Sequence, residues 1–487
     1  MTAGAMDIQT GQARWVRTVR ALLVAGAATA LLVSAARAAR GIPGETSIAV
    51  NHVSGVWTGL AVDFAGGELY RPLISDAGYG GTRFFPLHFV LHGLLIRAGL
   101  GPLAAGHLVT GIALLALLAG AFLFFRRSDV SPGMAAAGAL LLLANAPVDG
   151  ALVTIRGDLL AAALNVCGLA VALRPRAALG AALLFALAIL TKQTAVPGLA
   201  AAALALFFAG ERRRAVKLVV STALSVSVGL VAVQVASDGR FLQSMLACST
   251  AGATLAKLVR APINMFNSSI APDGFLVLLG IAALFAVPAA ALRNVPALFL
   301  LATAAVTVPL FGFPGIAENH FLELDLAVVI FVFAESSRHR LLPAFFQGAL
   351  VVSVLLFCIS VSLRPVERLR ETAAAAIAET RSGSGPLLAE NAWIPVLAGE
   401  RPFLIDAFMF KTVADRQPEI REDLLRRLRQ RFFRGVILDV DVLDRGEFAG
   451  WYRNTHFGPG FTEALLGNYH LVARHGDKLF VYRPDER

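Results

Sequence analysis

The chain has little charge, little lysine and little cysteine for its length. Of its 487 residues, 16% are charged and 57% are hydrophobic, whereas soluble globular proteins have about 25% charged and about 45–50% apolar residues. A chain with so few charges cannot bury all of its apolar surface in ordinary cores, so much of that surface must lie in lipid. This composition excludes a soluble enzyme, a disordered chain and a nucleic-acid-binding module.

The cysteine spacing and the absence of a glycine-rich phosphate loop argue against further classes of protein. Cys167 and Cys358 lie inside apolar runs, Cys248 lies alone between two runs, and no cysteine lies in the polar C-terminal tail. This spacing predicts neither a disulfide framework nor a metal site. The sequence also has no Walker-type phosphate loop, which argues against a nucleotide-driven pump.

The net charge of +10 comes mostly from arginine, because the chain has only five lysines. The arginines form short clusters between apolar runs. That is the pattern of cytoplasmic loops in membrane proteins, and not that of a nucleic-acid-binding surface.

Apolar runs of spanning or near-spanning length fill the chain up to residue 363. The first run follows Arg14, Arg17 and Arg20 and ends near Ala36. A basic flank, an apolar stretch and small residues also describe a signal peptide, but the many later runs favour a retained first membrane helix. The later runs lie at about 103–125, 132–149, 159–173, 177–191, 195–209, 215–236, 273–292, 295–313, 321–335 and 343–363.

The segment 84–98 is ambiguous, because it is short, begins near Pro86 and carries His88, His92 and Arg97. Charge inside a span is expensive, so we interpret the segment as an interfacial or re-entrant helix.

The positive-inside rule supports that interpretation. If 84–98 is not counted as a span and the N-terminus is cytoplasmic, all the arginine clusters of the loops face the cytoplasm. If 84–98 is counted as a span, all of these clusters face outside. The sequence therefore predicts an integral α-helical membrane protein with about eleven transmembrane helices, a cytoplasmic N-terminus and an extracytoplasmic C-terminus. The clusters are Arg126–Arg127, Arg174 and Arg176, Arg212–Arg214, Arg293, and Arg338 with Arg340.

Two domains follow from this division. Residues 1–363 form the transmembrane domain, with a first outer loop over 37–102. The tail 364–487 has no spanning run and holds more than half of the 33 acidic residues. Its helix-like patterns at 366–380 and 418–432 and its strand-like runs at 386–389, 435–440 and 478–482 predict a small extracytoplasmic α/β domain.

The first outer loop combines aromatic and polar side chains between residues 50 and 86. Trp57, Tyr70 and Tyr79 would suit an interface and an amphipathic ligand, although a structural loop packed on the bundle would also contain them. Its polar candidates are His52, Asp63, Arg71 and Arg83.

Three further groups lie at predicted outer ends of spans. Arg156 and Asp158 precede the run 159–173, where Asp158 could act in a reaction or simply favour the helix N-terminus. Lys192 lies between two runs, where it could meet a phosphate as a point charge or extend its amine to the interface. Glu318, Asn319 and His320, with Glu323 one turn later, cluster before the run 321–335.

Several stretches resemble the polytopic glycosyltransferases of the GT-C fold, in particular the bacterial branch with the lipid A aminoarabinose transferase and the protein O-mannosyltransferase-like enzymes (glycosyltransferase family 39). The likeness spans nearly the whole chain, although each motif is weak by itself. It rests on GVWTGLAVDFAGGELYRP, GGTRFFPLHF, RGDLLAAALNVCGLAV, LAILTKQTAVPGLA, ENHFLEL and the tail segments AENAWIPVLAGERPFLIDAFMF, FRGVILDVD and NYHLVAR.

The resemblance implies transfer of a sugar from a polyprenyl-phosphate donor at the outer face of the membrane. It implies an acidic residue in the first outer loop that acts on the acceptor, and a second acidic residue at the outer start of a later span, which Asp158 matches. Lys192 matches a lysine that binds donor phosphate, and Arg83 lies where relatives have a basic residue before a proline. Asp158 could orient the acceptor or hold a divalent cation.

The chain departs from the family just before Trp57. Relatives usually have Asp-Glu or Asp-x-Asp there, whereas this chain has Asn51-His52-Val53-Ser54. His52 and the downstream Asp63 are then the available bases.

The function implied is a glycosyltransferase, inverting if displacement is direct, in the bacterial cytoplasmic membrane. Its acceptor would be a glycan, lipid or protein hydroxyl. A polytopic transporter and a non-catalytic envelope protein are the alternatives.

Overall fold

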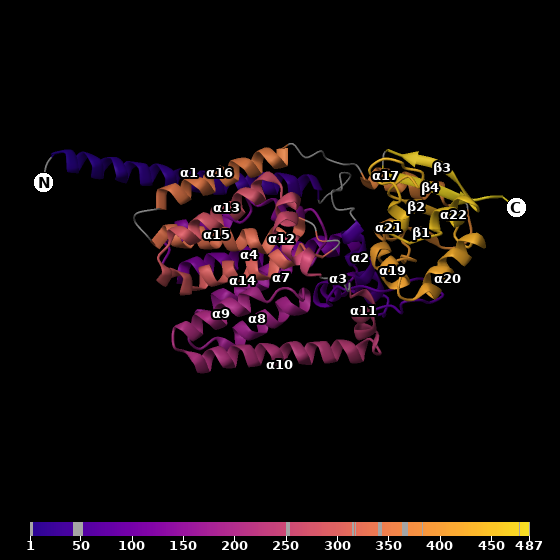
Figure 1. Cartoon of the computed structure of the whole chain (residues 1–487), viewed down its shortest axis with the longest axis horizontal. Helices are drawn as coiled ribbons and strands as arrows, with labels where there is room; N and C mark the ends of the chain where they lie inside the picture. Colours follow the sequence, from indigo (N-terminus) through magenta and orange to yellow (C-terminus); the bar gives the residue numbers. More distant parts are fainter. Residues whose placement is uncertain are drawn as a thin grey trace.

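The computed structural model describes residues 3–41, 52–249, 254–313, 316, 318–338, 343–362, 369–381, 383–476 and 478–486. Long helices lie side by side in a bundle, and a small sheet surrounded by short helices lies at the end of the bundle where the chain terminates (Figure 1). The N-terminus lies at the opposite end of the molecule (Figure 1).

The helices of the bundle follow the predicted apolar runs closely, because the runs are long and rich in apolar residues, and most are bounded by a glycine, a proline or a basic residue. They are α1 (Ala3–Gly41), α4 (Pro102–Arg127), α5 (Pro132–Leu141), α6 (Ala146–Leu152), α7 (Asp158–Ala172), α8 (Ala178–Thr191), α9 (Pro197–Phe208), α10 (Arg212–Ala236), α13 (Ala271–Ala286), η1 (Ala289–Arg293), α14 (Val295–Leu310), η2 (Glu318–His320), α15 (Phe321–Arg338) and α16 (Pro343–Ser362).

The run 132–149 is the exception, because it forms two helices rather than one. α5 and α6 meet at a bend of 76°. The Asn145 side chain accepts a hydrogen bond from the Val148 amide and so caps a new helix, and Pro147 in its first turn needs no amide partner. The predicted run 132–149 is therefore either a broken span or a re-entrant pair of helices.

Four described helices are long and apolar enough to cross a membrane, or five if the bent pair counts as one span. The other apolar helices have 10–17 residues, and at about 1.5 Å per residue these are shorter than a bilayer core of about 30 Å. The count of eleven spans therefore stays a prediction. The four helices are Trp15–Ala36, Pro102–Arg127, Arg212–Ala236 and Ala344–Ser362.

Small residues let the helices of the bundle approach closely. A Cβ atom at Gly120 would lie 2.7 Å from the Cys167 sulfur, and one at Gly138 would lie 2.4 Å from the Phe333 ring. On the outside of the bundle, by contrast, α10 exposes large apolar side chains such as Leu224. Close contacts between small residues inside and apolar groups outside are typical of a bundle packed in lipid.

The first outer loop contains α2 (His52–Ala65) and α3 (Leu87–Arg97). With 11 residues, α3 is only about 16 Å long; other apolar helices are similarly short, so the interfacial placement of 84–98 stays a prediction. The Trp57 ring stacks on Phe84 with centroids 4.4 Å apart. The two helices are therefore packed by the aromatic residues that the sequence places in this loop.

The C-terminal residues form a four-stranded sheet in the order β1-β2-β4-β3. β1 and β2 are parallel, and the other two pairs are antiparallel. Three strands coincide with predicted strand-like runs, whereas β3 was not predicted, because basic side chains interrupt and flank the short apolar stretch in its sequence YHLVARH. The elements are α17 (Leu369–Glu379), β1 (Leu387–Ala389), α18 (Trp393–Leu397), α19 (Ala407–Ala414), α20 (Pro418–Arg429), β2 (Gly435–Leu438), α21 (Trp451–Asn454), α22 (Phe461–Leu466), β3 (Tyr469–His475) and β4 (Leu479–Pro484).

The first outer loop packs directly on this C-terminal region. Gly78 has a φ of +120°, and a Cβ atom there would lie 1.9 Å from the Phe403 carbonyl oxygen, so only glycine fits this approach. The Tyr79 hydroxyl donates a hydrogen bond of 2.7 Å to Asp423. Two shorter helices, α11 (Arg240–Cys248) and α12 (Leu255–Ser268), lie between α10 and α13 in the chain.

Candidate functional site

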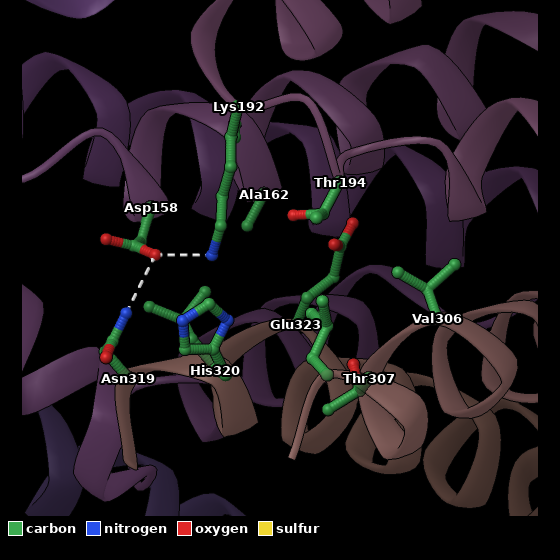
Figure 2. Close-up of a pocket in the computed structure, with 12 residues that line it drawn as sticks. Asp158, Ala162, Lys192, Thr194, Val306, Thr307, Asn319, His320 and Glu323 are labelled. Carbon is green, nitrogen blue, oxygen red and sulfur yellow. Dashed lines mark hydrogen bonds and ion pairs between the residues drawn. The ribbon is translucent and has the colours of Figure 1, made fainter. Parts of the chain in front are cut away.

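A polar pocket opens where four parts of the bundle meet: the start of α7, the junction of α8 and α9, the end of α14 and the segment η2–α15. The space not filled by protein atoms is about 360 Å³. Polar and charged side chains point into it from different helices (Figure 2). Its lining residues are Asp158, Ala161, Ala162, Lys192, Thr194, Val306, Thr307, Leu310, Asn319, His320, Leu322 and Glu323.

Asp158 and Lys192 form an ion pair at the centre of this pocket. The Lys192 Nζ atom lies 2.6 Å from Asp158 Oδ1, and the Asn319 amide donates to the same oxygen at 3.3 Å (Figure 2). Lys192 follows the last residue of α8 with an extended backbone, which lets its side chain cross toward the first residue of α7. The structure therefore brings together two residues that the sequence singled out separately.

Two arginines add positive charge beside this pair. Burial, together with the charges of Lys192, Arg83 and Arg156, lowers the pKa of His320 to about 3, although Asp158 acts in the opposite direction. His320 is therefore a neutral hydrogen-bonding group near pH 7. Three cations, Lys192, Arg83 and Arg156, and one carboxylate, Asp158, thus act on His320, an excess of positive charge suited to an anionic ligand.

Glu323 and Asn165 make a second polar pair in the wall of the pocket. The Asn165 amide donates a hydrogen bond to the Glu323 carboxylate. The sequence analysis did not single out Asn165, Thr194 or Thr307, which the structure places at or beside the pocket. Asn165 had a usable signal, because it lies seven residues after Asp158 and hence on the same face of α7.

Of the ten predicted site residues, only Asp158, Lys192 and His320 line the pocket among the side chains that the structure describes. Asp63 is buried, accepting from Arg71 at 2.6 Å and from Arg401 at 2.5 Å. Arg71 also donates to the Pro402 carbonyl at 2.6 Å. The Tyr70 hydroxyl donates to a backbone carbonyl at 2.8 Å. Asp63 and Arg71 thus join the first loop to the C-terminal region, whereas Tyr70 bonds within the loop. These contacts do not support the prediction that Asp63 is the base.

Two of the other predicted residues, His52 and Arg83, contact the C-terminal region. His52 is the first residue of α2 and meets Asp406, with Nε2 and Oδ1 3.2 Å apart. The Arg83 guanidinium lies over the Phe408 ring, 5.9 Å from its centroid. Glu318 belongs to η2, but its side chain lies outside the described part of the structure.

A divalent cation at Asp158 does not fit the residues that the structure describes. Such a cation takes several oxygen ligands, whereas Asp158 Oδ1 faces the Lys192 amine and the Asn319 amide. Within the described ranges, no group of three or more His, Cys, Asp or Glu side chains could hold a metal ion. We therefore assign no step to a metal.

The sequence matches no protein-family model and no curated protein sequence. The structure, however, is similar to that of ArnT from Cupriavidus metallidurans bound to undecaprenyl phosphate, with a TM-score of 0.60, 16% identity and coverage of 94% of this chain and 97% of that chain. It is also similar to the apo state of the same protein, with a TM-score of 0.55 and 16% identity over 96% of this chain and 98% of that one.

A third similar structure is the oligosaccharyltransferase of Archaeoglobus fulgidus tethered to an acceptor peptide. The TM-score is 0.54 and the identity 13%, over 96% of this chain and 74% of that one. Both neighbours are GT-C glycosyltransferases, and the match covers almost the whole of this chain. The chain therefore has the GT-C fold, as its sequence motifs predicted.

Proposed function

We propose that this protein is a membrane glycosyltransferase that moves a sugar from a polyprenyl-phosphate donor to a hydroxyl acceptor on a glycolipid, an envelope polysaccharide or a protein. One observation carries the proposal: in a chain with the GT-C fold, a pocket holds the Asp158–Lys192 ion pair and His320, and the charges of Lys192, Arg83 and Arg156 all act on His320. ArnT, which has this fold, was solved with undecaprenyl phosphate.

The pocket suits the leaving group of such a reaction. When the bond between the anomeric carbon and the phosphate oxygen breaks, the phosphate gathers negative charge. Cations fixed in advance stabilise that charge without reorganisation. Lys192 provides a point charge on a flexible stem, and its side chain is 28% exposed. It can therefore turn from Asp158 to a phosphate oxygen.

Asp158 then becomes available when the donor binds. The carboxylate that held the Lys192 amine can then accept a hydrogen bond from a sugar or acceptor hydroxyl, while the Asn319 amide continues to donate to the same carboxylate. We assign Asp158 to orienting the reacting hydroxyl. Direct displacement by one hydroxyl inverts the anomeric carbon.

The apolar part of the lining fits a lipid-linked donor. Ala161, Val306 and Leu310 line the same pocket as the charged residues. A polyprenyl phosphate has a charged head and an apolar chain, so a site for it needs both kinds of wall. Among the described residues, this pocket offers both on neighbouring helices.

The orientation that this function requires is the one predicted from the arginine clusters. About eleven spans in the bacterial cytoplasmic membrane would put the N-terminus in the cytoplasm, and the pocket and C-terminal region outside. We expect a reporter that works only outside the cytoplasm to be active when it is fused near Gly385. Activity of a cytoplasmic reporter at the same place would refute this topology.

The function itself is tested with purified protein in nanodiscs. The substrates are radiolabelled undecaprenyl-phosphate-linked glucose, galactose, mannose and 4-aminopentose, with an envelope fraction as acceptor. We expect release of undecaprenyl phosphate together with transfer of label to the acceptor from one of these donors. Binding without release would favour a non-catalytic protein, and movement of intact donor across a sealed vesicle would favour a transporter.

A further inference from the structure

A histidine–aspartate pair joins the first outer loop to the C-terminal region. His52 begins α2, and Asp406 precedes α19, 354 positions later in the chain. The His52 Nε2 and Asp406 Oδ1 atoms are 3.2 Å apart. Asp406 Oδ1 also accepts from the Phe408 and Met409 amides, at 3.0 Å each. Asp406 thereby caps α19, and the two amides hold its carboxylate in one orientation.

The partner of Nε2 determines which nitrogen of His52 can take a proton. An ionised carboxylate only accepts hydrogen bonds, so Nε2 must carry the hydrogen in the neutral ring. Nδ1 then holds the lone pair. This atom is buried and has no hydrogen-bond partner among the described residues. A buried acceptor without a partner is costly, which points to a ligand group that it meets during function.

The pair lies beside the segment that leads into the pocket. The Ser54 hydroxyl, two residues after His52, accepts from the Ile155 amide at 3.2 Å. A Cβ atom at Gly157, directly before Asp158, would lie 3.0 Å from the Trp57 ring. α2 therefore runs along residues 155–157.

Arg83 connects the two groups electrostatically. Its charge helps to lower the pKa of Asp406 on one side and that of His320 on the other. The charge of Arg83, whose guanidinium lies over the ring of Phe408 just after Asp406, therefore acts on both the histidine–aspartate pair and the pocket residue His320.

We propose that His52 is the general base of the glycosyl transfer proposed above, on which this assignment rests, and that Asp406 is its positioning residue. The acceptor hydroxyl gives its proton to Nδ1 as its oxygen bonds to the anomeric carbon. The bond from that carbon to the phosphate oxygen breaks, and its electron pair leaves with polyprenyl phosphate. The imidazolium that results is stabilised by the Asp406 carboxylate, as in a histidine–aspartate pair of hydrolases. His52 would thus provide the general base at the position just before Trp57, where relatives usually have an acidic pair.

Other charged groups face the same histidine. Burial lowers the pKa of His52, but the hydrogen bond and charge of Asp406 and the charges of Glu390 and Asp439 outweigh it, so that its pKa is raised. Burial and the charge of Glu390 raise the pKa of Asp439 itself to about 8. The His456 ring lies 5.2 Å from that of His52 and bonds to Glu390 through Nδ1. Asp406 is the group that contacts His52 directly.

The first variant is His52→Gln, assayed in nanodiscs with whichever undecaprenyl-phosphate sugar the parent uses. We expect kcat to fall by about 10²–10⁴-fold, the usual contribution of a general base. The Kd for undecaprenyl phosphate should stay the same, since His52 does not contact the phosphate. Parent-like kcat in this variant would place the base elsewhere while leaving the glycosyltransferase function intact.

The second variant, Asp406→Asn, separates positioning from folding. Asparagine keeps an oxygen that can cap α19 and accept from Nε2, but it removes the charge that raises the pKa of His52. A base must be unprotonated, so activity rises with pH through the pKa of His52. In this variant the rise should move to lower pH, and the maximal kcat should fall.

Asp423→Asn is the matched control, because it removes another buried carboxylate between the first loop and the C-terminal region, the one that accepts from Tyr79. Its pH profile should not move. An unmoved profile in Asp406→Asn, or an equal shift in both variants, would overturn the positioning role. If the parent neither binds undecaprenyl phosphate nor releases it from any donor, the proposed function fails, and the assignment of His52 fails with it.

Discussion

Two buried aspartates illustrate how differently the protein uses a carboxylate. Asp63 is held by Arg71 and Arg401 between the first loop and the C-terminal region, with 1% of its side chain exposed. Asp158 is held by the more exposed Lys192 and borders a pocket. Arginine guanidinium groups hold a carboxylate with several directed hydrogen bonds, whereas a single lysine amine can move away from the carboxylate. The first pair therefore stabilises the structure, and the second can exchange its partner for a ligand.

The largest effect that we expect comes from Asp158→Asn. Transfer should fall by about 10²–10⁴-fold, because the reacting hydroxyl loses its charged acceptor. Binding of undecaprenyl phosphate should persist or tighten, since Lys192 is released from its ion pair. Transfer rates and equilibrium binding in nanodiscs measure the two effects separately, and normal transfer would remove Asp158 from the site.

Asp63→Asn should instead act on stability. Removing one partner of a buried ion pair costs about 3–5 kcal/mol, so the midpoint of thermal unfolding in detergent should fall markedly while the activity per folded molecule stays near that of the parent. Asp238→Asn is the control, because its pair with Arg240 is exposed and should contribute less than about 1 kcal/mol. A stable but inactive Asp63→Asn protein would return Asp63 to the list of bases.

Lys192→Ala should weaken binding of undecaprenyl phosphate by roughly ten- to a hundredfold, as expected for loss of a charge-assisted hydrogen bond of about 1.5–3 kcal/mol. Lys192→Arg should restore part of it, because the charge is kept but the fork differs from a point contact. Short-chain prenyl phosphates should show the same loss. Lys217→Ala, on the exposed part of α10, is the matched control. Parent-like binding in Lys192→Ala would mean that the amine serves only its pair with Asp158.

The smallest effect should come from His320→Gln. Since the pKa of His320 is lowered to about 3, the ring gains a proton only near pH 3 and stays neutral between pH 5 and pH 9. A neutral glutamine should then change transfer by less than about threefold, or roughly 0.6 kcal/mol, without moving the pH profile. A shifted profile would show that His320, and not His52, titrates in the reaction.

The bundle could be predicted because its apolar runs are long and their ends carry glycine, proline or arginine. The break at Asn145 was missed because one capping side chain inside an apolar run gives a weak signal. The fold was predicted from motifs that were individually weak but numerous, and the structural likeness to ArnT over most of the chain agrees with it.

The candidate site could be predicted only in parts. Asp158, Lys192 and His320 each stood out as polar residues at the end of a run. That they meet depends on how α7, α8 and η2 pack, which no local pattern encodes. Asp63 looked equally promising in the sequence. No local pattern showed that its carboxylate is paired with Arg401, because Arg401 lies 338 positions away. The role of a buried charge is decided by its partner, and that partner was out of reach of sequence reasoning.

The contact between Arg71 and Pro402 spans 331 positions of the chain. At about 5–20 residues per second of synthesis, roughly 15–65 s separate the appearance of the arginine from that of the carbonyl that it binds. During this interval the first outer loop has left the ribosome without the surface that holds Asp63, Arg71 and Gly78. The early loop therefore reaches its final conformation only after the last part of the chain has been made, so a nascent chain stopped before residue 400 would carry every helix of the bundle and still lack a completed site.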